Sequence, residues 1–209
     1  MEPPASHSER GWILIGMAES CAARGYEATT VEDVCAAAGV GREAFDREFV
    51  DKDECLGAAM ESVVEEAWLA LEGALAPGKP WGEGLYDGTA ALLGSLAKRP
   101  AFAHVALIEV TPAVSGRAGA LAASARAALL DFLERGQRHA EAGIAASAAR
   151  GALAGAETLA RGHVLSGKAA QLGELTPDVV YMLAVPFLGV GEASLLAAGP
   201  RRRHLRAVA

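Results

Sequence analysis

The chain contains 209 residues, of which 52% are apolar, 22% charged and only 5% aromatic. This composition predicts a globular protein of one domain, or one core with a small appended module, and excludes a disordered chain. Acidic residues outnumber basic ones by 26 to 19, and the net charge of −7 argues against non-specific adhesion to nucleic acid or membranes over the whole surface.

Helical periodicity runs along almost the entire chain and predicts an all-α fold of about nine helices. The first helix is expected over residues 8–24. The second begins after Thr30, a good N-terminal cap with Asp33 three residues later, and it ends at Gly39. A short third helix follows over residues 42–49.

A long fourth helix is expected after Asp51, and the proline and glycine residues at 76–80 mark the clearest break in the chain. Beyond the break, apolar stripes predict further helices up to about residue 137. The last two helices differ from the others. One carries a stripe of very small side chains, and the other begins with Thr176 as its N-terminal cap and Pro177 at its first helical position.

The three cysteines, Cys21, Cys35 and Cys55, have no metal-binding spacing and are odd in number, so they are expected to be small buried side chains in a reducing cytoplasm. The longest apolar stretch covers residues 179–191 and is interrupted by a proline. About 20 residues are needed to span a bilayer. The sequence therefore predicts a soluble cytoplasmic protein that does not enter a membrane.

Residues 30–49 carry the strongest functional signal. A helix of about eight residues, a turn and a second short helix follow one another as in a helix-turn-helix motif. Glycine in the turn allows a positive φ without steric cost. The second helix can then present its outer side chains to the major groove of DNA. The apolar residues available to hold the two helices together are Val34, Ala38, Val40, Phe45 and Phe49.

Over about 50 residues this region resembles the tetracycline-repressor (TetR) family of transcriptional regulators. The resemblance is carried by residues 22–34 (AARGYEATTVEDV), 36–42 (AAAGVGR) and 45–56 (FDREFVDKDECL). It implies a three-helix DNA-binding head on a body of about six helices. Such regulators are typically homodimers that bind a near-palindromic operator and respond to a small molecule. The rest of the chain is similar to the family's ligand domain only in length and helicity.

The expected organisation is a DNA-binding domain over residues 1–50, a helical domain for ligand binding and dimerisation over 51–200, and a basic tail over 201–209. The expected DNA contacts lie at the start of the second helix, along the third and at the start of the fourth. They are Thr30, Arg42, Glu43, Asp46, Arg47 and Lys52.

The chain departs from the family pattern where it is expected to touch DNA. The recognition helix of the family usually carries a Tyr and then a His at the positions that Asp46 and Glu48 occupy here. Residues 1–60 contain five basic and twelve acidic residues, so the predicted head carries all of the net charge of −7. Either the basic residues still reach DNA while the acids point elsewhere or accept a hydrogen bond from cytosine, or the head keeps the fold and binds DNA weakly or not at all.

A small hydrophobic effector is the second predicted partner, bound in a largely apolar cavity among the helices of residues 56–165. His104 is either a core histidine satisfied by a backbone carbonyl or a polar anchor for this ligand. Glu109 is either a surface residue at a helix end or a buried carboxylate that meets a cationic ligand. The candidate lining residues are Met60, Val64, Trp68, Leu93, Phe102, His104, Leu107, Ile108, Glu109 and Phe132.

The small side chains near residue 152 and one face of the last helix suit a homodimer interface of four helices. The alternative is ordinary packing of these two helices within one chain. The residues expected at the dimer interface are Ala148, Ala152, Gly155, Leu159, Val180, Leu183, Phe187 and Leu195.

An enzyme has little support, because the sequence shows no nucleophile–base pair or metal motif, and no cofactor is expected. Residues 39–44 formally match a dinucleotide-binding fingerprint, but a helix stands where that fingerprint requires a strand. The sequence therefore predicts a ligand-responsive, dimeric DNA-binding regulator, most simply a repressor released from its operator by a small molecule. The alternative is a sensor or interaction protein that keeps this fold without strong DNA binding.

Overall fold

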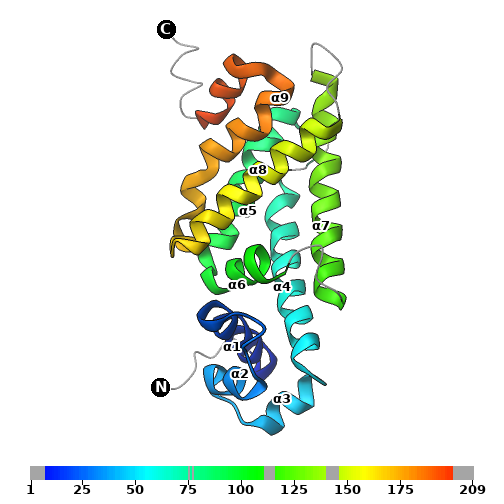
Figure 1. The fold of residues 1–209 in the computed structure, drawn as a ribbon. Coiled ribbons are helices and arrows are strands. Elements are labelled where there is room, and N and C mark those ends of the chain that lie inside the picture. The colour runs from blue at the N-terminus through cyan, green and yellow to red at the C-terminus, as the bar shows by residue number, and fades with distance from the viewer. Residues whose placement is uncertain (1–7, 75, 77, 111–115, 140–145, 200–209) are drawn as a thin grey trace. The chain divides into compact units, whose positions relative to one another are not determined.

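The computed structural model describes residues 8–74, 76, 78–110, 116–139 and 146–199, and every regular element in these ranges is a helix (Figure 1). The all-α fold class is thereby confirmed. The chain divides into two compact units, one of residues 1–65 with 99–124 and one of residues 66–98 with 125–209. These units have other bounds than the two domains expected from the sequence, 1–50 and 51–200, and that domain boundary stays a prediction. The predicted tail, 201–209, lies outside the described residues.

The first unit contains the predicted three-helix head, formed by α1, α2 and α3. The long helix α4 begins directly after the head and continues into the second unit. A short helix, α6, and one π-helical turn, η1, complete the described helices that lie wholly in the first unit. Their bounds are Glu9–Arg24 for α1, Val31–Ala38 for α2, Arg42–Glu48 for α3, Lys52–Glu72 for α4, Pro100–His104 for α6 and Val105–Glu109 for η1.

The crossing of α1 and α2 requires a glycine at position 16. A Cβ atom added to Gly16 would lie 2.6 Å from the Val34 carbonyl oxygen and 2.8 Å from the Ala38 amide nitrogen. Both are backbone atoms of α2, which a side-chain rotation cannot move. The two helices therefore approach each other at the backbone, and the side chains of Ile13, Met17 and Val34 are completely buried beside this contact.

The turn between α2 and α3 has the backbone expected for a helix-turn-helix motif. Gly39 adopts a left-handed conformation with φ 68° and ψ 30°, which glycine reaches without a steric penalty. This conformation lets the Val40 N–H donate to the Cys35 carbonyl at 3.0 Å and ends α2. Beneath α3, the Phe45 and Phe49 rings lie 5.6 Å apart between centroids and are almost fully buried.

The second unit is a helical bundle in which α5, α8 and α9 pack together (Figure 1). Trp81 joins several of its elements: the indole N–H donates to the Phe132 carbonyl at 3.1 Å, and the ring packs edge-on against Phe187 at 5.3 Å. The described helices that lie wholly in this unit are α5 (Trp81–Lys98), the 3₁₀-helix η2 (Arg135–His139), α8 (Ala146–Leu165), the 3₁₀-helix η3 (Ala169–Leu175) and α9 (Thr176–Ala197). A further helix, α7 (Gly116–Glu134), runs from the first unit into the second.

Three of the four residues of α9 that were predicted at the dimer interface face the core of their own unit, and the dimer interface stays a prediction. Val180, Leu183 and Phe187 are buried within the single chain. The small side chains of α8 explain this burial, because they admit α9 at close range: a Cβ added to Gly155 would lie 2.7 Å from the Met182 sulfur. The stripe therefore serves packing within the chain, the alternative weighed above. Ala152 is also buried, Ala148, Gly155 and Leu159 are half-buried, and Leu195 is 48% exposed.

The beginning of α9 also differs from the prediction. Thr176 is not the N-terminal cap but the first helical residue, and its hydroxyl donates backwards to the Gly173 carbonyl at 2.8 Å. The reason is that η3 leads directly into α9, so the chain never leaves helical geometry at this point. Further along, Pro186 and a left-handed Gly189, with φ 71°, interrupt the regular backbone of α9.

Residues 169–197 form one helical stretch that is long and apolar enough to cross a membrane by length and composition alone. This is weak support for a membrane span, because the core helix of a bundle passes the same test. Here α9 packs against α5 and α8, and the break at Gly189 interrupts its helical backbone. An interrupted helix is tolerated in lipid only where other groups satisfy the freed backbone.

We expect Gly16→Ala to lower the free energy of unfolding by about 2 kcal/mol, because overpacking against backbone atoms cannot be relieved by a rotamer change. Gly41→Ala is the matched control, since an added Cβ there meets no atom within 4 Å. Urea denaturation measures both variants. Equal, small losses in the two variants would contradict the close crossing of α1 and α2.

Candidate nucleic-acid interface

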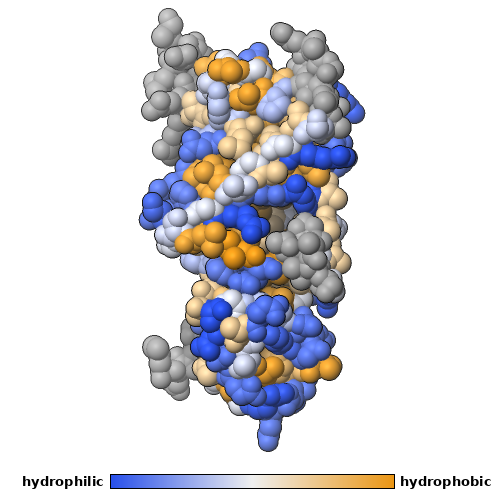
Figure 2. Space-filling model, viewed as in Figure 1, coloured by the Kyte–Doolittle hydropathy of each residue, from blue (hydrophilic) through white to orange (hydrophobic). Residues whose placement is uncertain are grey.

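The outer face of α3 consists of charged side chains of both signs. Arg42, Glu43, Asp46 and Arg47 are exposed, whereas Ala44 and Phe45 between them are buried. On the face shown in Figure 2, hydrophilic residues cover much of the head and are interrupted by smaller apolar patches. The buried phenylalanines thus fix which side of α3 faces solvent, and the predicted contact residues of this helix lie on that side.

Arg42 is held by carboxylates of two helices. Its Nε atom lies 2.8 Å from Asp46 Oδ1 on α3, and its Nη1 atom lies 2.8 Å from Glu32 Oε1 on α2. The hydrogen bond to Asp46 is the main reason that the pKa of Arg42 rises above its ordinary value, with Glu32 adding to the effect. The Arg42 side chain is 54% exposed, so its charge is neutralised at the surface rather than in the core.

Arg47 and Glu48 form two crossed ion pairs with the first turn of α1. Arg47 Nη2 lies 2.7 Å from Glu9 Oε2, and Arg10 Nη1 lies 3.3 Å from Glu48 Oε2. The Arg10 guanidinium also lies 4.5 Å from the centre of the Phe49 ring. The hydrogen bond to Glu9 raises the pKa of Arg47 above its ordinary value. These contacts fasten the C-terminal half of α3 to α1.

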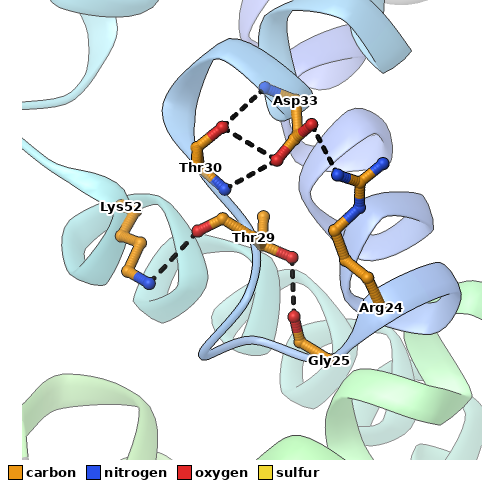
Figure 3. Close-up of polar contacts among 6 residues, drawn as sticks. All are labelled: Arg24, Gly25, Thr29, Thr30, Asp33 and Lys52. Carbon is orange, nitrogen blue, oxygen red and sulfur yellow. Dashed lines mark hydrogen bonds and ion pairs between the residues drawn. The ribbon is translucent and has the colours of Figure 1, made fainter.

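Thr30 begins α2 with a complete capping box (Figure 3). The Asp33 N–H donates to Thr30 Oγ1 at 3.2 Å, and the Thr30 N–H donates to Asp33 Oδ2 at 3.0 Å. Arg24 adds an ion pair to Asp33 at 2.7 Å. The Thr30 backbone N–H and then its hydroxyl hold the pKa of Asp33 below the ordinary value, with a smaller contribution from Arg24. The predicted cap is confirmed, and a phosphate contact by Thr30 stays a prediction.

Lys52 lies at the start of α4 and is directed into the loop between α1 and α2 (Figure 3). Its ammonium donates to the carbonyls of Tyr26 at 3.1 Å and Thr29 at 3.2 Å, and it lies 4.3 Å from the centre of the Tyr26 ring. In this half-buried placement the charge fixes the loop that leads into α2, and the contact of Lys52 with DNA stays a prediction. The Thr29 hydroxyl closes the same loop by donating to the Gly25 carbonyl at 2.8 Å.

Glu109 and His104 satisfy each other next to the same loop. His104 Nε2 lies 2.9 Å from Glu109 Oε1, and the Tyr26 N–H donates to Glu109 Oε2 at 3.1 Å. Glu109 is 15% exposed, so it is not the surface residue that one alternative expected. Neither is His104 satisfied by a backbone carbonyl alone. The pair connects the end of η1 to the loop before α2, and this contact is local to the first unit.

The other residues predicted to line an effector cavity are divided between the two units. Most lie in the first unit, on α4, α6 and η1, whereas Trp68, Leu93 and Phe132 lie in the second. Trp68 is 42% exposed, which is more than an enclosed lining residue allows. Met60, Leu93 and Phe102 are buried in their own units, while Val64, Leu107, Ile108 and Phe132 are half-buried. The effector site stays a prediction.

The three cysteines are buried, as the sequence predicted. All three are reduced. Burial raises the pKa of the Cys21 thiol to about 11 and that of Cys55 to about 12, so both remain protonated at neutral pH. Among the described residues, His, Cys, Asp and Glu side chains form no group that could hold a metal ion.

Every basic side chain in residues 8–60 has a partner within the chain. Arg10, Arg24, Arg42 and Arg47 pair with carboxylates, and Lys52 binds backbone carbonyls. Sequence reasoning missed Glu9 and Glu32 as the partners of the α3 arginines. The spacing of Arg42 and Asp46 by four residues was a usable signal, whereas nothing local indicates a pair between Glu9 and Arg47.

Residues 13–59 match the family model described as bacterial regulatory proteins, tetR family. This match covers the three helices of the head and the start of α4. The fold and the head thus define a helix-turn-helix protein. Its N-terminal segment is similar to the tetR family, in agreement with the resemblance seen in the sequence.

Solved structures of tetR-family regulators share the fold over most of the chain. A putative regulator from Syntrophomonas wolfei superposes with a TM-score of 0.61 at 18% identity, covering 85% of this chain and 94% of the other. The regulator PfmR from Thermus thermophilus gives 0.57 at 21%, covering 93% and 98%. A tetR-family protein from Rhodococcus gives 0.55 at 18%, covering 96% and 95%. Identities this low establish the fold alone. No curated protein matches the chain significantly.

We expect Asp33→Ala to unfold at lower urea concentration than the wild type at pH 7. The pKa of Asp33 in the folded state lies below its ordinary value of 3.8, so its ionised form stabilises the fold. This contribution is complete above the ordinary pKa and is lost as the pH falls through the lower folded-state value. The difference between variant and wild type should therefore shrink below about pH 4. A difference that stays constant with pH would contradict the assignment, and Asp33→Asn, which keeps an acceptor oxygen, should recover part of the loss.

Proposed function

We propose that the protein is a DNA-binding transcriptional regulator whose helix α3 enters the major groove. The observation that carries this proposal is the capped helix-turn-helix head, in which buried Phe45 and Phe49 leave one face of a short helix exposed. In such motifs the second helix contacts base edges while the preceding helix crosses the backbone. The tetR-family match over residues 13–59 supports the same function. We expect it to act in the cytoplasm, where bacterial DNA lies.

On this proposal Arg42 and Arg47 contact phosphates or bases. Glu43 is the candidate for direct reading of cytosine, because a carboxylate can accept a hydrogen bond from the cytosine N4 amino group. Asp46, the other carboxylate expected at this surface, is already bound to Arg42. Thr30 lies at the start of α2, where a hydroxyl can also meet a phosphate. Lys52 acts indirectly, because it binds the carbonyls of the loop that precedes α2 and so holds that loop in place.

We further propose that two chains associate, because a two-fold operator is read by recognition helices about 34–36 Å apart. The exposed apolar residues of α9 are the candidates for this contact. Tyr181 is 37% exposed before the break at Gly189, and Val190 and Leu195 are 64% and 48% exposed after it. Single exposed apolar residues need no explanation, but three on one element fit an interface between copies. Leu195 is also one of the interface residues expected from the sequence.

The proposed regulator responds to a small hydrophobic effector and acts as a repressor that the effector releases from DNA. The apolar residues of α4, α6 and η1 in the first unit support binding of a hydrophobic effector. The pair of His104 and Glu109 lies at the end of this group and contacts the loop before α2. A ligand that shifts η1 would therefore act on the start of the helix-turn-helix motif.

A second function is favoured by one specific observation. All five basic side chains of residues 8–60 are engaged within the chain, and phosphate neutralisation by such residues normally supplies non-specific DNA affinity. A sensor or interaction protein with the same fold and little DNA affinity is therefore the alternative.

Fluorescence anisotropy with a duplex from the region upstream of the protein's own gene tests the proposal. We expect binding at least about 10³-fold tighter than to a scrambled duplex of equal composition, the lower end for specific DNA binders. Arg47→Ala should weaken specific binding by about tenfold, as the loss of one charged contact predicts. A folded protein that binds neither duplex at low salt would support the sensor instead. The number of chains bound to each duplex tests the dimer.

A further inference from the structure

The arginines on the outer face of α3 are exposed yet already neutralised. Arg42 uses both Nε and Nη1 for carboxylates at 2.8 Å, and Arg47 uses Nη2 for Glu9 at 2.7 Å. These are the two cations that the proposed function brings to DNA. A phosphate that approaches either arginine therefore competes with Glu9, Glu32 or Asp46 for the charge of the guanidinium.

These carboxylates differ from two others of the head, which bind other partners. Asp33 takes part in the capping box of α2, and Glu48 pairs with Arg10 rather than with an arginine of α3. Glu9, Glu32 and Asp46, in contrast, are all at least 46% exposed and hold only the two α3 arginines among the ion pairs of the described chain. They come from three helices, α1, α2 and α3, and surround the same surface.

We propose that Glu9, Glu32 and Asp46 form a carboxylate latch that holds Arg42 and Arg47 away from DNA phosphates and so limits the affinity of the head for DNA. This inference rests on the proposed function. Each latch residue lowers affinity in two ways. It competes with phosphate for the guanidinium, and once displaced it remains beside the DNA as a like charge.

The latch weakens binding without abolishing it. Exposed ion pairs in water are individually weak, because solvent screens them and because holding two long side chains in one geometry has an entropic cost. A guanidinium can therefore exchange a carboxylate for a phosphate readily. The latch accordingly sets the salt range in which the head binds, rather than acting as a permanent block.

The test compares amide variants that keep side-chain size and remove charge. Glu9→Gln frees Arg47, and the double variant Glu32→Gln with Asp46→Asn frees Arg42. Glu19→Gln is the matched control, since Glu19 is an exposed carboxylate on α1 outside the ion pairs described above. Affinity for the upstream duplex and for its scrambled counterpart is measured by anisotropy across a salt series, after circular dichroism has shown that each variant is folded.

We expect each freed arginine to steepen the slope of log K against log salt by about 0.9 and to raise affinity about eightfold at 0.1 M salt, because its contact with DNA then neutralises a phosphate without a competing carboxylate charge beside it. Glu19→Gln should bind like the wild type. Adding Arg42→Ala to the double variant should remove its gain, which separates release of Arg42 from a general change of charge.

The outcomes separate the latch from the proposed function. If the wild type binds and the freed variants bind no tighter than Glu19→Gln, the latch is wrong and the regulator stands. If only the freed variants bind, the latch is supported and the wild type is the weak binder of the alternative function. If no form binds any duplex, both proposals fail.

Discussion

Pairing between the arginines of α3 and the carboxylates around them determines the charge that the head can offer to DNA. Arg42 connects α3 to α2 through Glu32, and Arg47 connects α3 to α1 through Glu9. These contacts between the recognition helix and its neighbours therefore engage the same charges that the helix needs for DNA. Residues 1–60 contain twelve acidic and five basic residues, and this excess of carboxylates favours such pairing. Each of the five basic side chains binds a carboxylate or a backbone carbonyl of the chain.

Burial of apolar side chains, rather than ion pairing, holds α3 in place. The arginines can therefore exchange a carboxylate for a phosphate without displacing the helix. A helix of seven residues is not stable alone in water. Phe45 and Phe49 are almost fully buried beneath it, and burying such a side chain contributes about 1.5–3 kcal/mol. Exposed ion pairs in general contribute only about 0–1 kcal/mol each. Loss of the pairs on DNA binding would therefore leave the helix in position while changing the charge that it presents.

The parts of the structure that the sequence predicted are those set by neighbours in the chain. The Thr30 cap, the left-handed Gly39 and the bounds of α2 and α3 follow from local hydrogen bonding and steric rules. Contacts between distant residues carry no such signal. Glu9 and Arg47 are 38 positions apart, and the orientation of Lys52 depends on a loop 23 to 26 residues earlier. For α9, the apolar pattern identified a buried face but not whether its partner was α8 of the same chain or a second copy.

The most direct test of this account is the mobility of the α3 guanidiniums in the free protein. Nitrogen-detected NMR measures rotation about the Nε–Cζ bond of each arginine. We predict slow rotation for Arg42, which is held through both Nε and Nη1, and faster rotation once Glu32 and Asp46 are replaced by their amides. Rotation of Arg42 as fast as that of free arginine in the wild type, with no change in the double variant, would contradict it.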